Sequence, residues 1–383
     1  MFYTLSLIIP CYNEVRTIAD CLSRVRRITA GRSFGLEIIV VDDASTDGSL
    51  GILETIAAGN PEIRVLKHEK NRGKGAALRT GLLHATGDYV GIQDADSEYE
   101  PADYIAMLEP LLDGRADVVF GSRYLKPDTR RVLYFWHTWM NKNLTIVSNM
   151  FTNLDITDME TCYKLFRREV IREIAPALKE ERFGFEPEVT AKIAQGNYRV
   201  YECAVSYNPR SYAEGKKIGW KDGVHALYCI LHYGTHMAPL PMQILLYLCI
   251  GFASLAVNMI FFYGALRAGV PIAYAIGGAF GAAAFCNYLL CIQILFRHKA
   301  RWNTAGEVFF YIVSVAFMGC VDYGVTRGFL FLARSPLWAK FWASILGFIG
   351  NFLLRRRLVF PEKRAWHIPQ DSRLPGPKGR IRR

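Results

Sequence analysis

Apolar and polar positions follow two different patterns along this chain. Up to about residue 235, short apolar runs alternate with charged segments, whereas residues 242–354 contain long apolar runs with few charges. The first pattern is typical of a soluble α/β domain, and the second is typical of helices inside a lipid bilayer. The sequence therefore predicts a soluble half followed by a membrane half.

Short apolar runs in the soluble half predict buried strands at 4–10, 36–41, 63–66 and 88–93. Pro10 is expected to end the first strand, because proline cannot donate to a sheet ladder. Helices are predicted between the strands, from apolar spacing over 18–28 and over 76–85. Strands that alternate with helices favour βαβ units, so we expect a Rossmann-like, mostly parallel sheet.

Polar loops follow these strands. Because the carboxyl ends of parallel strands meet at one edge of a sheet, where open α/β sheets bind their ligands, we expect one cleft there. The residues predicted to converge on it are Tyr12, Asn13, Glu14, Asp42, Asp43, Lys74, Asp94 and Asp96. Carboxylates can accept the ring N–H of a nucleobase, while a lysine and a metal ion offset the charge of a diphosphate.

The segment Gly91–Glu98 carries the strongest metal-binding pattern. Asp94 and Asp96 close a strand, and Glu98 follows two positions later. Hard cations such as Mg²⁺ or Mn²⁺ take such oxygen ligands and keep open positions for phosphate oxygens. An Asp-rich turn that caps a helix starting near Pro101 explains this segment equally well when it is taken alone.

Four segments in this order resemble the nucleotide-sugar half of family 2 glycosyltransferases with the GT-A fold: SLIIPCYNE, EIIVVDDASTDGS, NRGKGAALRTG and GDYVGIQDADSEYEP. The resemblance extends to Arg123 and covers about a third of the chain. It implies that the nucleoside is held by Pro10, Tyr12, Glu14, Asp42 and Asp43. It also implies that Asp94 contacts the nucleoside or the sugar and that Asp96 binds the metal. Glu98 is a further candidate ligand, because a third anionic group is compatible with Mg²⁺ or Mn²⁺. Asp94, Asp96 and Arg123 are the candidate catalytic residues.

Later segments resemble the subgroup that glycosylates polyprenyl phosphates, such as dolichyl-phosphate mannose synthase: DMETCYKLFR, FGFEPE, YNPR and EGKKIGW. Those synthases usually carry Gln where this chain has Glu98, so the sugar does not follow from the resemblance. The candidates for holding the lipid phosphate and the donor diphosphate are Arg123, Arg130, Arg131, Arg210, Lys216 and Lys217. A solvated face explains Arg130 and Arg131 equally well. Glu186 and Glu188 fit a helix start better than a general base, because a phosphate acceptor is already anionic.

A helix over 222–237 carries His225, His232 and His236 on one face. We favour a helix on the membrane surface over a metal site there, with its lipid-facing residues being Leu227, Tyr228, Ile230 and Leu231. The expected domains are therefore a soluble domain at 1–220, this interfacial helix at 221–240, a membrane domain at 241–360 and a basic tail at 361–383.

Four spans are predicted in the membrane domain, at 242–266, 272–296, 308–332 and 337–354. Basic clusters after the second and fourth spans, together with an N-terminus too short for a signal peptide, place the soluble domain and both termini in the cytosol. A shift of 64 positions pairs residues of both hairpins, so the spans are expected to be a duplication. Asn258, Asp322, Asn287 and Asn351 should then face protein or water, in helix packing rather than in a transport path.

The membrane half resembles the GtrA-like four-span family, and its closest match lies at 351–360. This resemblance implies a link to polyprenyl-phosphate sugars. The net charge of +11 gathers near the C-terminus beside a span, which favours anionic lipid over nucleic acid as the partner. Nine scattered cysteines without a CxxC pair predict buried, reduced thiols.

Together these patterns predict an inverting, metal-dependent transfer of a hexose at the cytosolic membrane face. The donor would be a nucleotide-diphosphate sugar of the GDP-mannose or UDP-glucose type, and the acceptor would be dolichyl or undecaprenyl phosphate. The alternatives are transfer to another membrane acceptor, a flippase role for the membrane half, and a nucleotide-sugar sensor without chemistry. The sequence leaves homo-oligomerisation open.

Overall fold

The computed structural model describes residues 2–125, 131–209, 220–235, 238–296, 304–331, 346, 349–350 and 352–354. They belong to two compact units, an N-terminal unit within Met1–Met237 and a C-terminal unit that begins at Ala238. Each unit is described by itself below.

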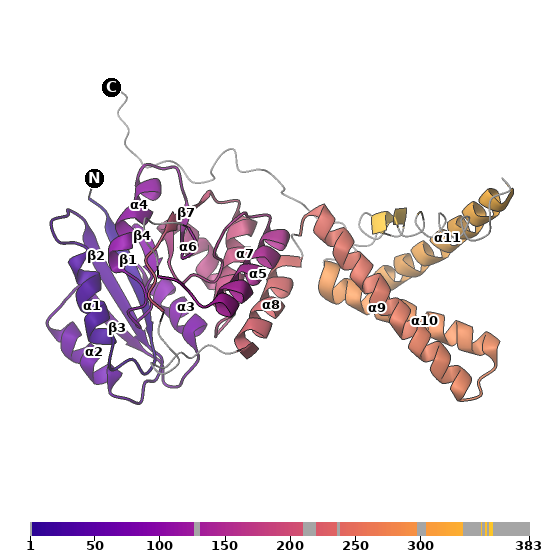
Figure 1. The fold of residues 1–383 in the computed structure, drawn as a ribbon, viewed down its shortest axis with the longest axis horizontal. Helices are drawn as coiled ribbons and strands as arrows, with labels where there is room; N and C mark the ends of the chain where they lie inside the picture. Colours follow the sequence, from indigo (N-terminus) through magenta and orange to yellow (C-terminus); the bar gives the residue numbers. More distant parts are fainter. Residues whose placement is uncertain are drawn as a thin grey trace, which may run out of the picture. The chain divides into compact units, whose positions relative to one another are not determined.

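A seven-stranded sheet lies at the centre of the described N-terminal unit, in the order β3-β2-β1-β4-β6-β5-β7 (Figure 1). The strands are β1 (Thr4–Cys11), β2 (Gly35–Asp42), β3 (Ile63–Lys67), β4 (Tyr89–Ile92), β5 (Val118–Ser122), β6 (Lys164–Arg167) and β7 (Val200–Ala204). The first four strands pair in parallel, as do β5 and β7, but β6 runs antiparallel to both of its neighbours. The predicted α/β class is confirmed, in the form of a mixed sheet.

Pro10 does not end β1, contrary to the prediction. The ladder between β1 and β2 continues through Cys11 opposite Asp42. The carbonyl of Cys11 then accepts a hydrogen bond from the Asp43 backbone N–H at 2.8 Å. A proline lacks only its own N–H, so a strand can run past it where the neighbouring residues carry the pairing.

Helices cover the sheet: α1 (Ile18–Arg27), α2 (Ser49–Ala58), α3 (Lys74–His84), η1 (Pro101–Asp103), α4 (Tyr104–Leu112), α5 (Phe135–Thr152), α6 (Arg168–Ile174), η2 (Ala175–Ala177), α7 (Phe185–Gly196) and α8 (Trp220–Gly234). The spacing of apolar residues in α1 buries Ile18, Leu22 and Val25, as the pattern predicts. Helices α5 and α7 both pack against α8, and Figure 1 shows the three side by side. The predicted helix at 222–237 is therefore a packed part of the N-terminal unit.

In the C-terminal unit the described helices are α9 (Leu240–Arg267), α10 (Ile272–Leu290), a π-helical turn at Cys291–Phe296 and α11 (Thr304–Phe331). Their bounds agree closely with the first three predicted spans. Within the described residues, α9 is the one helix long and apolar enough to cross a membrane by length and composition. The fourth predicted span lies mostly outside the described residues, and the number of spans and their orientation stay predictions.

The buried faces of α9 and α11 support the predicted duplication. Buried positions pair at the same offset of 64 along the sequence: Tyr247 with Tyr311, Ile250 with Ser314, and Ser254 with Met318. The ring of Tyr247 contacts Phe352 at 5.4 Å between centroids, and that of Tyr311 contacts Tyr288 at 4.9 Å. Because Tyr288 and Phe352 are also 64 positions apart, the first helix of each copy contacts the second helix of the other copy.

Polar side chains in the described part of the C-terminal unit form hydrogen bonds between helices. The Asn287 amide donates to the Ser254 hydroxyl at 3.1 Å, and the Tyr311 hydroxyl donates to the Ala284 carbonyl at 3.1 Å. This agrees with helix-to-helix hydrogen bonding, the role favoured for the predicted Asn positions. Asn351 and the side chain of Asp322 lie outside the described residues.

Candidate active site

A cavity of about 380 Å³ opens at the carboxyl ends of β1, β2 and β4. The predicted site residues that line it are Pro10, Tyr12, Glu14, Asp43, Lys74, Asp94, Asp96, Glu98 and Arg123. They come from four separate loops and the N-terminus of α3. The expected convergence on one edge of the sheet is therefore what the structure shows for these residues.

Lys74 joins two carboxylates inside the cavity. Its Nζ lies 2.9 Å from Asp94 Oδ1 and 3.3 Å from Glu186 Oε1. Burial alone would lower the pKa of Lys74, but the neighbouring negative charges, led by Asp94, raise it well above the ordinary value. The lysine therefore stays charged.

Close approach of two loops explains how Lys74 reaches the cavity. A Cβ on Gly75 would lie 2.5 Å from the Glu180 carbonyl oxygen, and Gly73 has a φ of +99°. The Ala76 N–H also donates to the Glu181 carbonyl at 3.1 Å. The two glycines thus let the start of α3 press against residues 180–182.

Asp96 and Glu98 are held in a tight turn at the cavity wall. The Glu98 N–H donates to Asp96 Oδ1 at 3.2 Å, and Ser97 between them has a φ of +59°. The Tyr207 hydroxyl donates to Glu98 Oε2 at 2.8 Å. With Asp94 nearby, the donor set is made of carboxylate oxygens, which fits a hard divalent cation.

Asp43, Asp42 and Asn13 position loops in the structure. The Asp43 carboxylate accepts from the N–H groups of Arg72 and Gly73 at 2.9 and 2.6 Å, and from His68 at 2.7 Å. Asp42 is 1% exposed and does not line the cavity; its Oδ1 has no partner among the described residues.

The Asn13 side chain accepts from the Thr46 N–H at 2.8 Å and joins the first loop to the second. It does not line the cavity either. The predicted contacts of Asp42, Asp43 and Asn13 with a nucleoside stay predictions.

In the structure Arg123 forms an ion pair with Asp158, a partner that the sequence analysis did not predict. Its Nε and Nη2 donate to the two oxygens of Asp158, both at 2.7 Å, and both side chains are buried. The guanidinium also lies over the Tyr207 ring at 5.1 Å. Arg123 thus lines the cavity from inside a fixed ion pair.

The other predicted phosphate ligands are less defined. Arg131 is exposed and donates to the Pro209 carbonyl at 3.4 Å. It does not line the cavity. Arg130, Arg210, Lys216 and Lys217 lie outside the described residues.

Comparison with known proteins now identifies both parts. Residues 6–175 match the family described as glycosyl transferase family 2, and residues 246–360 match the GtrA/DPMS transmembrane domain. The chain joins a family 2 glycosyltransferase domain to a GtrA/DPMS transmembrane domain. Both predicted resemblances are confirmed, and the chain is a membrane protein.

Curated relatives match about half of the chain. A dolichyl-phosphate beta-glucosyltransferase of Trichomonas vaginalis is 29% identical over 216 residues, which is 53% of this chain and 63% of the relative. An undecaprenyl-phosphate mannosyltransferase of Micrococcus luteus is 28% identical over 223 residues, or 55% of this chain and 86% of the relative. A dolichyl-phosphate beta-glucosyltransferase of Drosophila melanogaster is 31% identical over 48% of this chain and 61% of the relative. The chain thus spans less than two thirds of two of these relatives.

Among solved structures, glucosyl-3-phosphoglycerate synthase from Mycobacterium tuberculosis, in complex with Mn²⁺, uridine-diphosphate and phosphoglyceric acid, is similar with a TM-score of 0.46. It is 19% identical, and the match covers 60% of this chain and 78% of that chain.

Glu160 of the glycosyltransferase domain lines the cavity, although the sequence gave it no role. Its Oε1 is buried and has no hydrogen-bond partner among the described residues. Burial raises the pKa of Glu160 to about 8, and the negative charge of Glu186 adds to the shift. The only sequence signal was its place in the segment DMETCYKLFR, which carried the resemblance without assigning residues.

This pKa predicts how Glu160→Gln behaves. The folded domain keeps the Glu160 proton from the ordinary pKa of 4.5 up to about 8, so stability is lost as pH rises through that window. A glutamine stays neutral throughout, so we expect Glu160→Gln to be more stable relative to wild type at about pH 9 than at about pH 5. Thermal unfolding at both pH values checks this; an equal difference at the two values contradicts it.

Helices α5 and α8 of the glycosyltransferase domain border the cavity through His137 and Asn141 on α5, and through Asp222 and Ala226 on α8. Their outer faces are apolar. The exposed large residues there are Phe135, Trp136, Trp139, Met140, Ile146 and Met150 on α5, and Trp220, Val224, Leu227 and Tyr228 on α8. Trp136 is 72% exposed and Trp220 is 77% exposed. A patch of this kind beside a cavity marks a docking face for protein or membrane.

The predicted lipid-facing residues of α8 are corrected in part. Leu227 and Tyr228 are exposed, as expected, but Ile230 is only 2% exposed. Ile230 shares a helix face with Ala226 and Tyr233, which are four and three positions away and also buried. Of the predicted buried cysteines, Cys249 and Cys320 are exposed, and none of the nine is in a disulfide bond.

Proposed function

We propose that the chain transfers a hexose from a nucleotide-diphosphate sugar to a polyprenyl phosphate, with inversion at the anomeric carbon. The observation that carries this proposal is one cavity that holds charged groups and is bordered by two helices with apolar exposed faces. Lys74 and the acids that follow β4 are the charged groups, and α5 and α8 are the helices. The names of the curated relatives support the same substrate classes.

The donor would occupy the part of the cavity that holds these charged groups. Pro10, Tyr12 and Glu14 line it beside the carboxyl end of β1, where a nucleoside would bind. Lys74 would face the diphosphate, and Asp94, which pairs with Lys74, would face the sugar hydroxyls. The base and the sugar, GDP-mannose or UDP-glucose in type, are part of this proposal.

The acceptor would enter the cavity from the side of α5 and α8. A polyprenyl phosphate keeps its tail in the bilayer, so the domain that uses it must bring its cavity to the membrane surface. The aromatic residues Trp136, Trp139 and Trp220 suit the interfacial zone, because their rings have an apolar body and a polar edge. We therefore place this apolar face against the cytosolic leaflet.

Asp96 and Glu98 would hold Mg²⁺ or Mn²⁺. When bound, the cation would offset the negative charge that develops on the departing nucleoside diphosphate. The Glu98–Tyr207 hydrogen bond would keep one ligand oriented, and the turn at Ser97 would keep the acids on one side. No general base is required, because the phosphate oxygen that attacks the anomeric carbon is already ionised near neutral pH.

The function is tested with the purified full chain in nanodiscs. We expect lipid-linked sugar to form from dolichyl or undecaprenyl phosphate with at least one of a panel of labelled GDP- and UDP-sugars, in the presence of Mg²⁺ or Mn²⁺. The product should carry the inverted anomeric configuration. No lipid-linked sugar with any donor, or product that forms equally well on an unphosphorylated polyprenol, would count against the proposal.

A matched variant tests the acceptor side in the same assay. Trp136→Ser with Trp139→Ser removes exposed aromatic area without touching a residue that lines the cavity. We expect about a tenfold rise in KM for the long-chain acceptor and an unchanged KM for the donor, because only membrane contact is weakened. Equal changes in both constants would contradict the placement of this face.

A further inference from the structure

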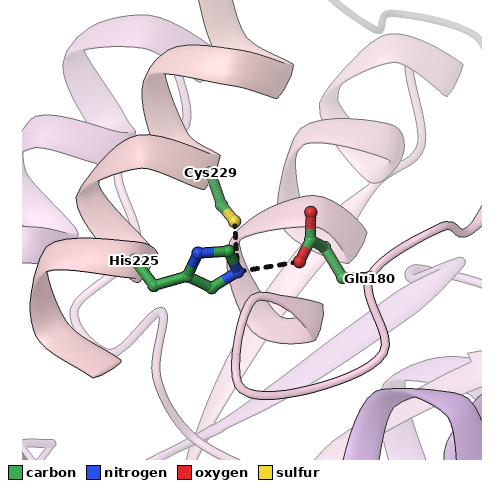
Figure 2. A group of neighbouring side chains, drawn as sticks. All are labelled: Glu180, His225 and Cys229. Atoms are coloured by element: carbon green, nitrogen blue, oxygen red, sulfur yellow. Dashed lines mark hydrogen bonds and ion pairs between the residues drawn. The ribbon is translucent and has the colours of Figure 1, made fainter. Parts of the chain in front are cut away.

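A second cluster of metal-ligating side chains lies in the N-terminal unit, on residues that do not line the cavity. Figure 2 shows Glu180, His225 and Cys229 pointing toward one another. Glu180 Oε2 lies 2.9 Å from His225 Nε2, and Cys229 Sγ lies 3.5 Å from the same nitrogen. One oxygen, one nitrogen and one sulfur thus gather within 4.8 Å of one another.

Two elements hold the three side chains in place. His225 and Cys229 are four positions apart on α8, so they share one face of the helix. Glu180 belongs to the segment between η2 and α7, and this segment is fixed by the Glu188 carboxylate. Glu188 Oε2 accepts from the N–H groups of Lys179 and Glu180 at 2.9 and 2.8 Å.

The backbone beside the cluster leaves room for these atoms. A Cβ at Gly184 would lie 2.5 Å from Glu180 Oε2 and 2.6 Å from Cys229 Sγ. Gly184 has no positive φ, so its conformation does not require glycine. The requirement is space between the carboxylate and the thiol, and an alanine there would fill it.

We propose that Glu180, His225 and Cys229 form a binding site for a borderline-soft divalent cation of the Zn²⁺ class. Such ions bind thiolate, imidazole and carboxylate at about 2.0–2.3 Å, and three protein ligands with one open position are a common set. Ligand atoms around a tetrahedral ion are then roughly 3.3–3.8 Å apart. The two separations at His225 Nε2, 2.9 and 3.5 Å, need shifts of under about 1 Å, and the thiol gives up its proton on binding.

The surroundings fit this assignment. The Tyr233 hydroxyl donates to Glu180 Oε1 at 2.9 Å, which leaves Oε2 directed at the cluster. Such an outer hydrogen bond orients a ligating carboxylate. Cys229 is buried, while the His225 side chain is 44% exposed, so an ion can enter from the histidine side.

This site differs in chemistry from the carboxylates that follow β4. Those offer oxygen alone, which suits Mg²⁺ or Mn²⁺, whereas sulfur and imidazole select Zn²⁺ or Co²⁺. A bound ion would tie α8 to the segment that leads into α7, with water at the open fourth position. Both elements supply cavity-lining residues, Arg182 and Phe183 on one side and Asp222 and Gly223 on the other.

Cobalt titration of the metal-stripped full chain in nanodiscs tests the site. We expect one equivalent of Co²⁺ to bind with a tetrahedral visible spectrum and a thiolate charge-transfer band, and Zn²⁺ to displace it. Cys229→Ala should lose the charge-transfer band, and His225→Ala should weaken binding at least about tenfold. Gly184→Ala should also weaken Co²⁺ binding at least about tenfold, although it removes no ligand. The control Cys203→Ala changes a partly buried thiol on β7 and should bind as wild type does.

A wild-type spectrum without a thiolate band at saturating Co²⁺ would overturn the proposal. Glu180, His225 and Cys229 would then form only a hydrogen-bond network. An unchanged band in Cys229→Ala would overturn it as well. Because the wild-type titration is decisive by itself, a variant that fails to fold does not remove the test. Spectra are independent of turnover, so failure of this site and failure of the proposed transfer reaction are distinguishable.

Discussion

Asp96→Ala is expected to lower kcat for sugar transfer by about a thousandfold or more, because it removes a carboxylate ligand at the point where the leaving diphosphate gains charge. Asp96 lines the cavity on the turn that follows β4. The variant should keep its KM for the polyprenyl phosphate, since that substrate enters from the side of α5 and α8. Steady-state kinetics with saturating metal measure both constants.

The Asp96→Asn variant removes the negative charge of this side chain but keeps the hydrogen bond that shapes the turn. An asparagine oxygen can still accept from the Glu98 N–H, which the aspartate does at 3.2 Å, so the turn should keep its shape. We expect the asparagine variant to lose nearly as much activity as the alanine variant, with an unchanged melting temperature. Asp113→Ala, in the turn after α4, serves as a control for loss of a carboxylate. Wild-type turnover in Asp96→Ala would contradict the metal-binding role assigned to Asp96.

The predictions from sequence were most accurate for features that depend on residues close together along the chain. The strands β1 to β4 were found to within one residue at each end, because each is a short apolar run between polar segments. The convergence of Lys74 and Asp94 followed from the rule that parallel strands end at one edge. The offset of 64 in the membrane half was equally visible in the sequence, and buried positions of α9 and α11 lie at the same offset, while the duplication itself stays a prediction.

Long-range pairing was not predictable in the same way. Strand β6 enters the sheet antiparallel between β4 and β5, and no residue in a four-residue strand signals its direction. Asp158 binds Arg123 from 35 positions away, and only the folded chain shows which carboxylate is the partner. Helix α5 was missed because its exposed aromatic residues weaken the usual apolar periodicity, since large apolar side chains lie on its outer face as well as on its buried face.

Arg123→Ala is expected to lower the free energy of unfolding of the glycosyltransferase domain by about 3–5 kcal/mol, because it leaves the fully buried Asp158 without its partner. The two hydrogen bonds of 2.7 Å make this pair bidentate, so Arg123→Lys should recover only part of the loss. Urea unfolding of the full chain in detergent, followed by tryptophan fluorescence, measures the change. A loss below about 1 kcal/mol would show that the pair is not buried as the structure has it.

A double variant then separates stability from chemistry at the same position. Arg123→Met with Asp158→Leu removes both charges, so most of the lost stability should return, since apolar replacement of a buried pair is often neutral. If Arg123 also faces the substrate phosphates, as the sequence predicts and its place on the cavity wall permits, this stable double variant will still transfer sugar at least about a hundredfold more slowly. Activity restored together with stability would mean that the arginine acts only by holding Asp158 and the adjoining loop in place, and the phosphates would then depend on Lys74 for their positive charge.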